Sequence, residues 1–329
     1  MSDAEDALAA AVDLPTLRVV RALAEHGTLT AAAEATGYSQ PALSQQLRRF
    51  EQRTGLALVE RVGRGLRLTQ AGRTLARHAR PVRAALDAAV GELAELAGLG
   101  AGRLRLVAFP SASPTLVPAL ISELGARHPG IELSYVEAEP PEAVAAVRED
   151  RADLAITFSY PGDRDDPHRA SARGLDVRAY GEEPMRLVLP AGHPAAHGAD
   201  PGEPVPLESL AEEGWIAGCP RCRGHLLELC DTAGFAPRIA FETDNFVAVE
   251  GMVAQALGVA LLPALALAAS SRRPGVVTRP TARADRRSLH LVTARGAERV
   301  PAVAAALQAL RTLPPASANP RPGGEHPAG

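Results

Sequence analysis

Three helix-forming segments follow one another between residues 13 and 55 of this 329-residue chain, with short turns between them. Asp13, Thr28 and Ser39 are of the types that cap helix N-termini, and Gly27 and Gly37 suit the left-handed position that ends a helix. The chain therefore begins with a small helical domain in which a tight turn joins the second and third helices. We expect helices over residues 15–26, 30–35 and 40–53.

The third segment has one apolar and one polar face. Its apolar face carries Leu43, Leu47 and Phe50, and the opposite face carries Pro41, Ser44, Gln45 and Arg48. In a helix-turn-helix the second helix lies in the major groove, where glutamine pairs with adenine and arginine with guanine. The alternative from periodicity alone is a small helical domain with a solvated polar face.

Residues 56–59 and 66–69 are expected to form two short strands around Gly63-Arg64-Gly65, which makes a wing with Arg64 at its tip. Ten arginines and two glutamates lie between residues 48 and 83, although the net charge of the whole chain is -3. This local excess of positive charge indicates a surface for an anionic polymer. All 35 basic residues are arginines, which points to a GC-rich genome and weakens arguments from arginine number alone.

These segments resemble the signature of LysR-type transcription regulators. The matching stretches are Thr30–Glu34, Ser39–Arg48, Glu60–Arg61 and Arg64–Gly72, in order and at the family's spacing. Leu29 and Val59 depart from it, because family members often have phenylalanine there. The resemblance implies a winged helix-turn-helix, with the wing arginines near phosphate or the minor groove. The residues it assigns to DNA binding are Thr30, Ser39, Gln40, Pro41, Ser44, Gln45, Arg48, Arg61 and Arg64.

From Thr69 the chain is expected to form a long helix with an apolar seam. Steps of four and three residues connect Leu75, Ala79, Val82, Leu86, Ala89, Leu93 and Leu96. Such a seam is typical of a coiled coil, and a DNA reader of this type normally binds two half-sites through a two-fold axis. The alternative is a surface helix packed on its own domain. Gly98, Gly100 and Gly102 would form a hinge after it.

From Arg103 the pattern changes to apolar strands alternating with amphipathic helices, which predicts a parallel sheet with helices on its faces. A second unit begins near Met185, and the last strand (289–293) and helix (300–313) are expected to return to the first. The whole is an α+β multidomain protein. Its predicted parts are a winged helix-turn-helix (1–72), a linker helix (73–99), a two-lobed α/β effector domain (103–313, second lobe about 181–280) and a disordered tail (314–329).

The family resemblance continues more weakly through Gly102–Leu106, Asp153–Ile156 and Gly258–Pro263. It implies a fold like that of periplasmic binding proteins, with a small-molecule effector between the lobes. Hydroxyls and free amides at a helix N-terminus would favour an anion. An equal alternative is that Ser111 and Ser113 only cap a helix starting near Pro114. The positions assigned to the effector are Ser111, Ala112, Ser113, Thr157, Phe158, Gly218, Cys219, Asn245 and Phe246.

Cys219-Pro220-Arg221-Cys222 is the one motif that hints at other chemistry. A C-x-x-C pair beside arginines can hold a lowered thiol pKa or bind a metal. The sequence has no second cysteine pair to accompany this motif. Cys230 is expected on a helix and His225 is the only histidine nearby, so a tetrahedral zinc site would be incomplete. The alternatives are redox or metal sensing and a loop that merely shapes the effector pocket. We predict no bound metal.

The remaining sequence narrows the function further. No run of about 18 apolar residues occurs, and the acidic, alanine-rich start does not resemble an export signal, so we expect a cytoplasmic protein with no membrane contact. No nucleophile elbow or phosphate loop is visible, which argues against an enzyme, and no cofactor is expected. The expected partners are double-stranded DNA with an interrupted inverted repeat, a small effector and further copies in a homodimer or homotetramer. The rival is a two-lobed binding protein or thiol-dependent enzyme with an accessory helical domain.

Overall fold

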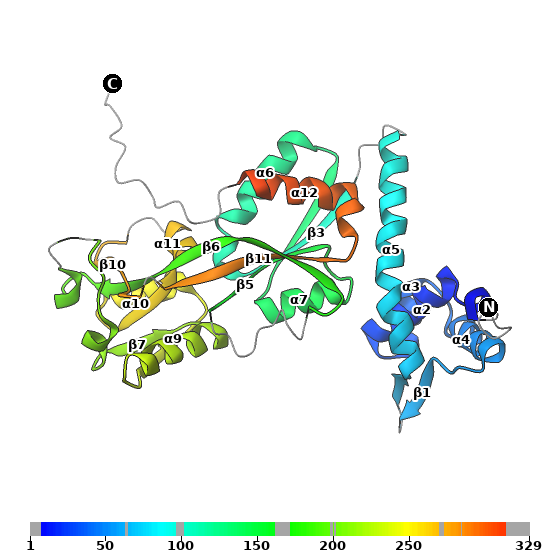
Figure 1. The fold of residues 1–329 in the computed structure, drawn as a ribbon, viewed down its shortest axis with the longest axis horizontal. Coiled ribbons are helices and arrows are strands. Elements are labelled where there is room, and N and C mark those ends of the chain that lie inside the picture. Colours follow the sequence, from blue (N-terminus) through cyan, green and yellow to red (C-terminus); the bar gives the residue numbers. More distant parts are fainter. Residues whose placement is uncertain are drawn as a thin grey trace.

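The computed structural model describes residues 8–62, 65–96, 102–161, 172–197, 200, 202–269, 273–283 and 285–313. Figure 1 shows a helical part beside two α/β lobes, with the long helix α5 standing between them. No helix in these ranges is long and apolar enough to cross a bilayer. The helical part comprises α2 (Leu14–His26), α3 (Leu29–Thr36), α4 (Gln40–Thr54), β1 (Val59–Val62), β2 (Gly65–Leu68) and α5 (Gln70–Leu96).

The three expected capping side chains are confirmed. Asp13 accepts a hydrogen bond from the Thr16 amide at 2.8 Å. Thr28 and Ser39 accept from amides three residues later, at 3.2 and 3.3 Å. Gly27 and Gly37 end their helices at φ 68° and 72°, a conformation that costs glycine least. The helix boundaries thus follow from local chemistry.

One apolar core joins α2, α3, α4 and the wing. Val19, Val20, Leu43 and Phe50 are buried in it, and Leu58 closes it below the wing. The wing hairpin is confirmed, with Val59 facing Leu68 and Val62 facing Gly65. The expectation that its first strand covers 56–59 was wrong, since β1 begins at Val59. Thr69 bonds back to the carbonyls of Ala57 and Leu58, which holds those residues outside the ladder.

Helix α5 is 27 residues long and includes Pro81 in its interior. Its predicted seam divides into two parts. Leu75 packs against the core of the helical domain and Ala79 is buried, whereas later positions are open, with Leu86 at 44% and Leu93 at 65% exposure. The buried alanines Ala84 and Ala88 lie elsewhere on α5, which contacts η4 (Ala297–Arg299) and α12 (Pro301–Thr312). Gly98 and Gly100 of the expected hinge lie outside the described residues, as does the tail 314–329.

The effector part is built on strands in the order β4-β3-β5-β11-β6-β9-β7-β8, with β10 paired to β6. We call the β4-β3-β5-β11 end the first lobe and the β9-β7-β8 end, with β10, the second lobe. The strands are β3 (Gly102–Ala108), β4 (Ile131–Glu137), β5 (Leu154–Ser159), β6 (Leu175–Pro190), β7 (Gly214–Ala217), β8 (Arg238–Glu242), β9 (Val259–Pro263), β10 (Val276–Pro280) and β11 (Arg286–Ala294).

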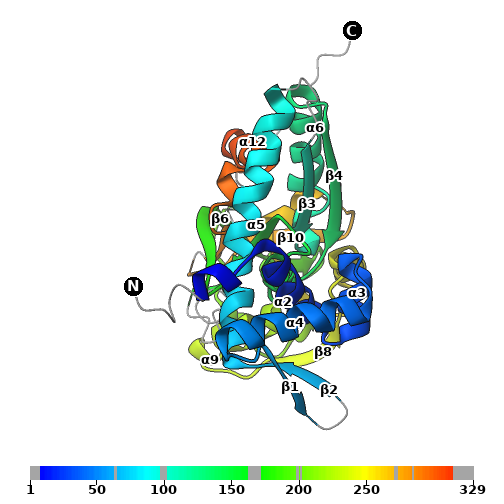
Figure 2. The same cartoon turned by 90° about the vertical axis from the view of Figure 1, so that its right-hand side faces the viewer.

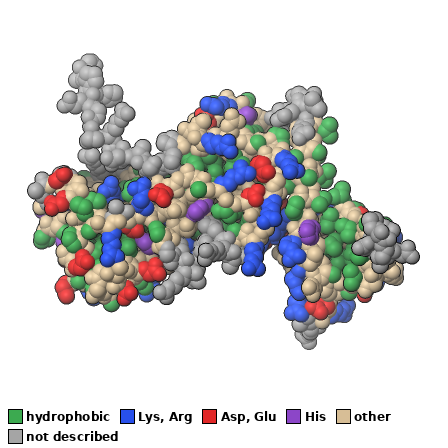
Figure 3. Space-filling view, in the orientation of Figure 1, with side chains coloured by type: hydrophobic (Ala, Val, Ile, Leu, Met, Phe, Trp, Pro, Cys, Tyr) green, Lys and Arg blue, Asp and Glu red, His purple; other side chains and the backbone are tan. Residues whose placement is uncertain are grey.

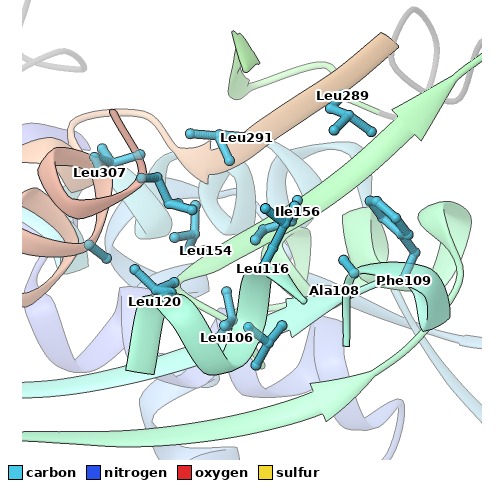
Figure 4. Close-up of a cluster of buried hydrophobic side chains, with 14 of the residues drawn as sticks. Leu106, Ala108, Phe109, Leu116, Leu120, Leu154, Ile156, Leu289, Leu291 and Leu307 are labelled. Atoms are coloured by element: carbon cyan, nitrogen blue, oxygen red, sulfur yellow. The ribbon is translucent and has the colours of Figure 1, made fainter. Parts of the chain in front are cut away.

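Helices cover both lobes. They are α6 (Leu116–Arg127), α7 (Pro140–Arg148), α9 (Pro220–Thr232), α10 (Phe246–Ala254) and α11 (Ala264–Ala269), with short turns η1 (Pro110–Ala112), η2 (Pro194–Ala196) and η3 (Leu207–Leu210). Figure 4 shows the first-lobe core, where leucines of α6 and α12 meet Leu106, Ile156 and Leu291 of the strands. Trp215 is fully buried at the centre of the second lobe.

The expected return of the final strand is confirmed, because β11 pairs with β5. The expected parallel sheet is confirmed for β3 with β4 and β5 and for β7 with β8 and β9, but it was wrong for β6 and β11. β11 and β6 both run antiparallel to their neighbours, and β6 extends over 16 residues rather than starting near Met185. Its first ten residues begin with apolar and polar residues in alternation, but Gly181-Glu182-Glu183-Pro184 interrupts this strand pattern before Met185. β6 therefore passes from one lobe into the other, beside β11.

Candidate DNA-binding surface and effector cleft

The polar face of α4 is open to solvent. Gln40, Pro41, Gln45 and Arg48 are exposed, Ser44 is half-buried, and Ser39 uses its hydroxyl to cap the helix. Thr30 is exposed on the preceding helix. A surface hollow of ≈ 630 Å³ lies over this face and is also lined by Arg49 and Gln52, which sequence reasoning missed. Both continue the same polar face by one helical turn, a spacing that could have identified them.

Two adjacent glutamines of α4 have different roles. The Gln46 amide donates to the Thr16 hydroxyl at 2.9 Å and to Asp13 at 3.4 Å, so it ties α4 to α2. Gln45 is exposed and lines the hollow. Of these two glutamines, Gln45 is the one whose amide is open to a partner outside the chain, to which an amide can donate and accept at once.

The wing extends beyond α4, as Figure 2 shows. Arg61 is exposed on β1. Arg67 faces Glu60 across the ladder and pairs with it at 2.8 Å, which lowers its contribution to positive charge. Arg64 lies outside the described residues.

The arginines of the predicted basic block do not all face one way. Figure 3 shows arginine side chains gathered where α5 approaches the first lobe. A hollow of ≈ 1320 Å³ there is lined by Arg80, Arg83 and Arg105, among others. Burial, and then the charge of Arg148, lowers the pKa of Arg80. Arg21 of α2 pairs with Asp150 of the first lobe in the same region. Arg21, Arg80 and Arg105 thus lie where the helical part meets the first lobe, with Arg83 exposed at the edge of that region, and none of them belongs to the α4 surface.

A cavity between the lobes brings together five of the predicted effector residues: Ser111, Phe158, Gly218, Cys219 and Phe246. The other four do not line it. Ala112 and Thr157 are fully buried. The Asn245 side chain caps α10 by accepting from the amides of Val247 and Ala248.

Ser113 turns toward β4, where it bonds Tyr135 and donates to Glu137. The capping alternative for Ser111 and Ser113 was wrong, because α6 starts at Leu116 after Thr115 with no side-chain cap. Ser111 instead accepts a hydrogen bond from Arg287 at 2.6 Å.

Arg287 is the charged centre of the cavity. It is 2% exposed, donates to Glu183 at 2.6 Å, and lies 4.7 and 4.2 Å from the ring centroids of Phe109 and Phe158. Burial, the largest single effect, lowers its pKa, but the charges of Glu183, Tyr160 and Cys222 and the hydrogen bond to Glu183 together raise it. Sequence reasoning missed Arg287, because nothing in its arginine-rich segment separates a buried position from exposed ones.

The two cysteines of the C-x-x-C motif lie on the cavity wall. Cys219 is the N-cap of α9, and its thiol donates to the Cys222 sulfur at 2.9 Å. This bond, helped by the Arg287 charge and by the Tyr160 hydroxyl at 3.5 Å, lowers the pKa of Cys222 to about 6 against the effect of burial. The same bond, with burial, raises the pKa of Cys219.

Glu139 completes the cluster from the first lobe. Burial, and then the charges of Cys222 and Asp244, raise its pKa to about 7, although a hydrogen bond with Cys219 opposes the shift. One oxygen of Glu139 is buried without a hydrogen-bond partner. Across the described ranges, no three His, Cys, Asp or Glu side chains are placed to hold a metal ion.

Comparison with known proteins agrees with this geometry. Residues 14–73 match the family described as bacterial regulatory helix-turn-helix protein, lysR family, and residues 97–314 match the LysR substrate binding domain. The DNA-binding transcriptional dual regulator OxyR of Escherichia coli (strain K12) is 29% identical over 286 residues, covering 85% of this chain and 89% of that protein. The transcriptional regulator CbbR of Sinorhizobium medicae is 33% identical over 187 residues, 56% of each chain.

The full-length structure of an OxyR variant from Pseudomonas aeruginosa superposes with a TM-score of 0.66 at 24% identity, covering 92% of this chain and 95% of that one. That similarity supports the fold as a whole: helical domain, long helix and two lobes. Taken with the family matches over both parts, it leads to one conclusion. The chain belongs to the LysR family of bacterial DNA-binding transcription regulators and carries that family's substrate-binding domain.

Proposed function

We propose that two α4 helices, presented by a homodimer or by a pair of protomers in a homotetramer, bind an interrupted inverted repeat in double-stranded DNA. Gln45, Ser44 and Arg48 face the base edges, while Gln40 and Pro41 flank them. The observation that carries this proposal is the contrast between the open Gln45 and the inward Gln46 on one helix. Only one face of α4 is available to a groove.

Other side chains hold the backbone of the DNA. Thr30 and Ser39 lie at or near helix N-termini, where phosphate is favoured. Arg61 of the wing and Arg49 of α4 are exposed cations beside the same surface, and we assign Arg64 of the wing tip to this group. Because each arginine–phosphate contact releases counterions, affinity should fall steeply with salt.

We propose the cavity between the lobes as the effector site, lined by Ser111, Phe158, Gly218, Cys219 and Phe246. As it stands it holds ≈ 50 Å³, whereas sites for drug-sized ligands hold about 300–1,000 Å³. An effector of that size requires the lobes to part. An anionic effector would also have to displace Glu183 from Arg287, because the guanidinium is already paired. Ligand-driven lobe movement would then shift the geometry of the paired DNA-binding domains.

In this proposal the chain is a regulator in the cytoplasm rather than an enzyme, since binding and release of DNA and effector need no turnover. The experiment is recovery of genomic fragments bound by the purified protein, followed by footprinting with metabolites of neighbouring pathways added one at a time. A protected inverted repeat whose footprint changes with one metabolite supports the proposal. Fragments recovered without sequence preference would move weight to the rival binding-protein or thiol-enzyme function.

A further inference from the structure

A hollow of ≈ 1320 Å³ lies between the helical part and the first lobe, and it shares no lining residue with the effector cavity. Its walls are α2 and α5 on one side, and β3, the loop before β4 and the first turn of α12 on the other. Arginine side chains gather in this region in Figure 3. Sites for drug-sized ligands hold about 300–1,000 Å³, so the hollow has room for a metabolite as it stands.

The carboxylates described in this lining are already paired. Seven arginines and four acidic residues line the hollow. Three of the arginines take up the four carboxylates; the pairs are Arg21 with Glu25 and Asp150, Arg105 with Asp150 and Asp153, and Arg83 with Asp87. Arg127 and Arg151 pair with Glu123 and Glu149, which do not line it. The lining therefore carries a surplus of positive charge.

Arg80 of α5 and Arg103 of β3 are the remaining arginines. Neither forms an ion pair with another residue that the structure describes. Among those residues, the buried Nε of Arg80 has no hydrogen-bond partner, and neither has one buried terminal nitrogen of Arg148 on α7. Burial, and then the charge of Arg148, lowers the pKa of Arg80, although Glu25 and Glu149 act in the opposite direction. An anion beside Arg80 would accept from the buried donor and offset the repulsion between the two guanidinium groups.

The first turn of α12 adds a second source of positive potential. Pro301, Ala302 and Val303 line the hollow, and no side chain caps this 12-residue helix at Val300. Free amides and the helix dipole favour an anion at such an end. Gly91 brings α5 close to it, since a Cβ at this glycine would lie 2.6 Å from the Pro301 ring. The arginines of α5 and the start of α12 are therefore neighbours.

We propose that this hollow binds a ligand with two or more linked phosphate groups, either a nucleoside polyphosphate or an inorganic polyphosphate. Arg80 and Arg103 contact the phosphate oxygens, and the start of α12 offers backbone amides. Three arginines near one another, Arg80, Arg103 and Arg148, have no carboxylate partner among the described residues. A multiply charged anion matches that surplus better than a single carboxylate does.

Such a ligand would touch both parts of the chain. It would contact the helical part through α5 and the first lobe through β3 and α12, and so hold the two parts in their present arrangement. This consequence rests on the proposed function, because a fixed helical part must alter operator binding. Linkage then requires that operator DNA change the affinity for the ligand by the same factor. Binding of the ligand itself can be measured without DNA.

The test is calorimetric titration of the full-length chain with inorganic triphosphate, ATP and orthophosphate, in about 0.15 M salt to screen weak surface contacts. We expect saturable binding of triphosphate and weaker binding of orthophosphate. Arg80→Gln and Arg103→Gln should each weaken triphosphate binding about 10- to 100-fold, the effect of losing a charge-assisted hydrogen bond. Tighter binding of ATP than of triphosphate identifies a nucleotide as the ligand, and equal affinities identify the phosphate chain alone.

Arg77→Gln is the matched control and should bind like the wild type, because Arg77 is exposed on α5 one turn earlier and does not line the hollow. Arg48→Ala tests whether the anion binds the α4 surface instead. Arg103 is exposed, so Arg103→Gln decides the matter if the Arg80 variant fails to fold.

The inference is overturned if the wild type does not bind triphosphate, if orthophosphate binds equally well, or if Arg103→Gln keeps full affinity. Loss of triphosphate binding in Arg48→Ala also overturns it. Operator affinity that triphosphate leaves unchanged overturns the coupling between the site and DNA. A chain that binds triphosphate but no DNA sequence selectively overturns the proposed function instead, and the anion site then stands by itself.

Discussion

Arg287 of β11 and Glu183 of β6 face each other in the ladder, and their side chains meet at 2.6 Å with 2% and 0% exposure. The other carboxylate oxygen of Glu183 accepts a hydrogen bond from the Leu265 amide at 2.8 Å. Burying an ion pair costs desolvation energy, which is offset only when the remaining polar atoms of both side chains have hydrogen-bond partners. Here hydrogen bonds provide those partners. The pair ties together the two strands that pass between the lobes.

Glu183→Gln should destabilise the chain by about 3–5 kcal/mol, because it leaves the Arg287 charge buried without a counter-charge. Urea unfolding measures this. Glu182→Gln is the matched control, since the neighbouring Glu182 pairs with Arg286 on the surface at 3.1 Å and should cost about 0–1 kcal/mol. Similar losses for both variants would contradict the assigned role of the buried pair.

Gln45→Ala should weaken operator binding by about 1–3 kcal/mol, the value of one good base contact, with binding to random DNA nearly unchanged. Gln46→Ala should instead lower thermal stability, because it loses the bonds to Thr16 and Asp13. Fluorescence anisotropy on both DNAs, with melting curves, separates the two effects. Equal loss on operator and random DNA for Gln45→Ala would refute base contact by this side chain.

Glu139→Gln should remove a fall in stability with rising pH. The pKa of Glu139 is raised from 4.5 to about 7 in the folded chain, so between these values the folded state binds more protons than the unfolded state. Stability then declines as pH rises through this window. Unfolding free energies at pH 5 and pH 8 test it, with exposed Glu142→Gln as control. An unchanged difference between the two pH values in Glu139→Gln would rule out this contribution.

Leu93→Glu on α5 should shift the protein from dimer to monomer and weaken operator binding. The reason is that we expect the exposed apolar stripe containing Leu86 and Leu93 to pack against the α5 helix of a second copy. Sedimentation velocity measures the mass. Asp87→Ala, which only breaks a surface pair with Arg83, should leave the assembly intact. A Leu93→Glu protein that keeps its mass would exclude this stripe as the interface.

The helical domain was predictable almost residue by residue, because Asp13, Thr28 and Ser39 act locally. A capping side chain bonds to an amide three residues away, so the start of a helix can be predicted from the neighbouring residues alone. The apolar face of α4 was equally plain. The start of β1 was not, because it depends on Thr69 bonding back to residues 57 and 58 across the hairpin.

The cleft was only partly predictable. The family resemblance identified Ser111, Phe158 and Gly218, but it also suggested Ser113 and Asn245, which bond elsewhere. Arg287 and Glu139 reach the cavity through long-range strand pairing and lobe packing. Pairs more than 100 residues apart leave no local pattern, so composition and periodicity could not find them.

The position of β11 between β5 and β6 also has a consequence during synthesis. The helical domain is continuous in sequence and complete once α5 has been made. The sheet of the effector domain lacks a central strand until residues 286–294 leave the ribosome. At about 5–20 residues per second, the interval between those events is roughly 10 to 40 s. During this interval the nascent chain carries a complete helical DNA-binding domain and an incomplete effector domain. Any message cut short before β11 would yield the same fragment, without control by an effector.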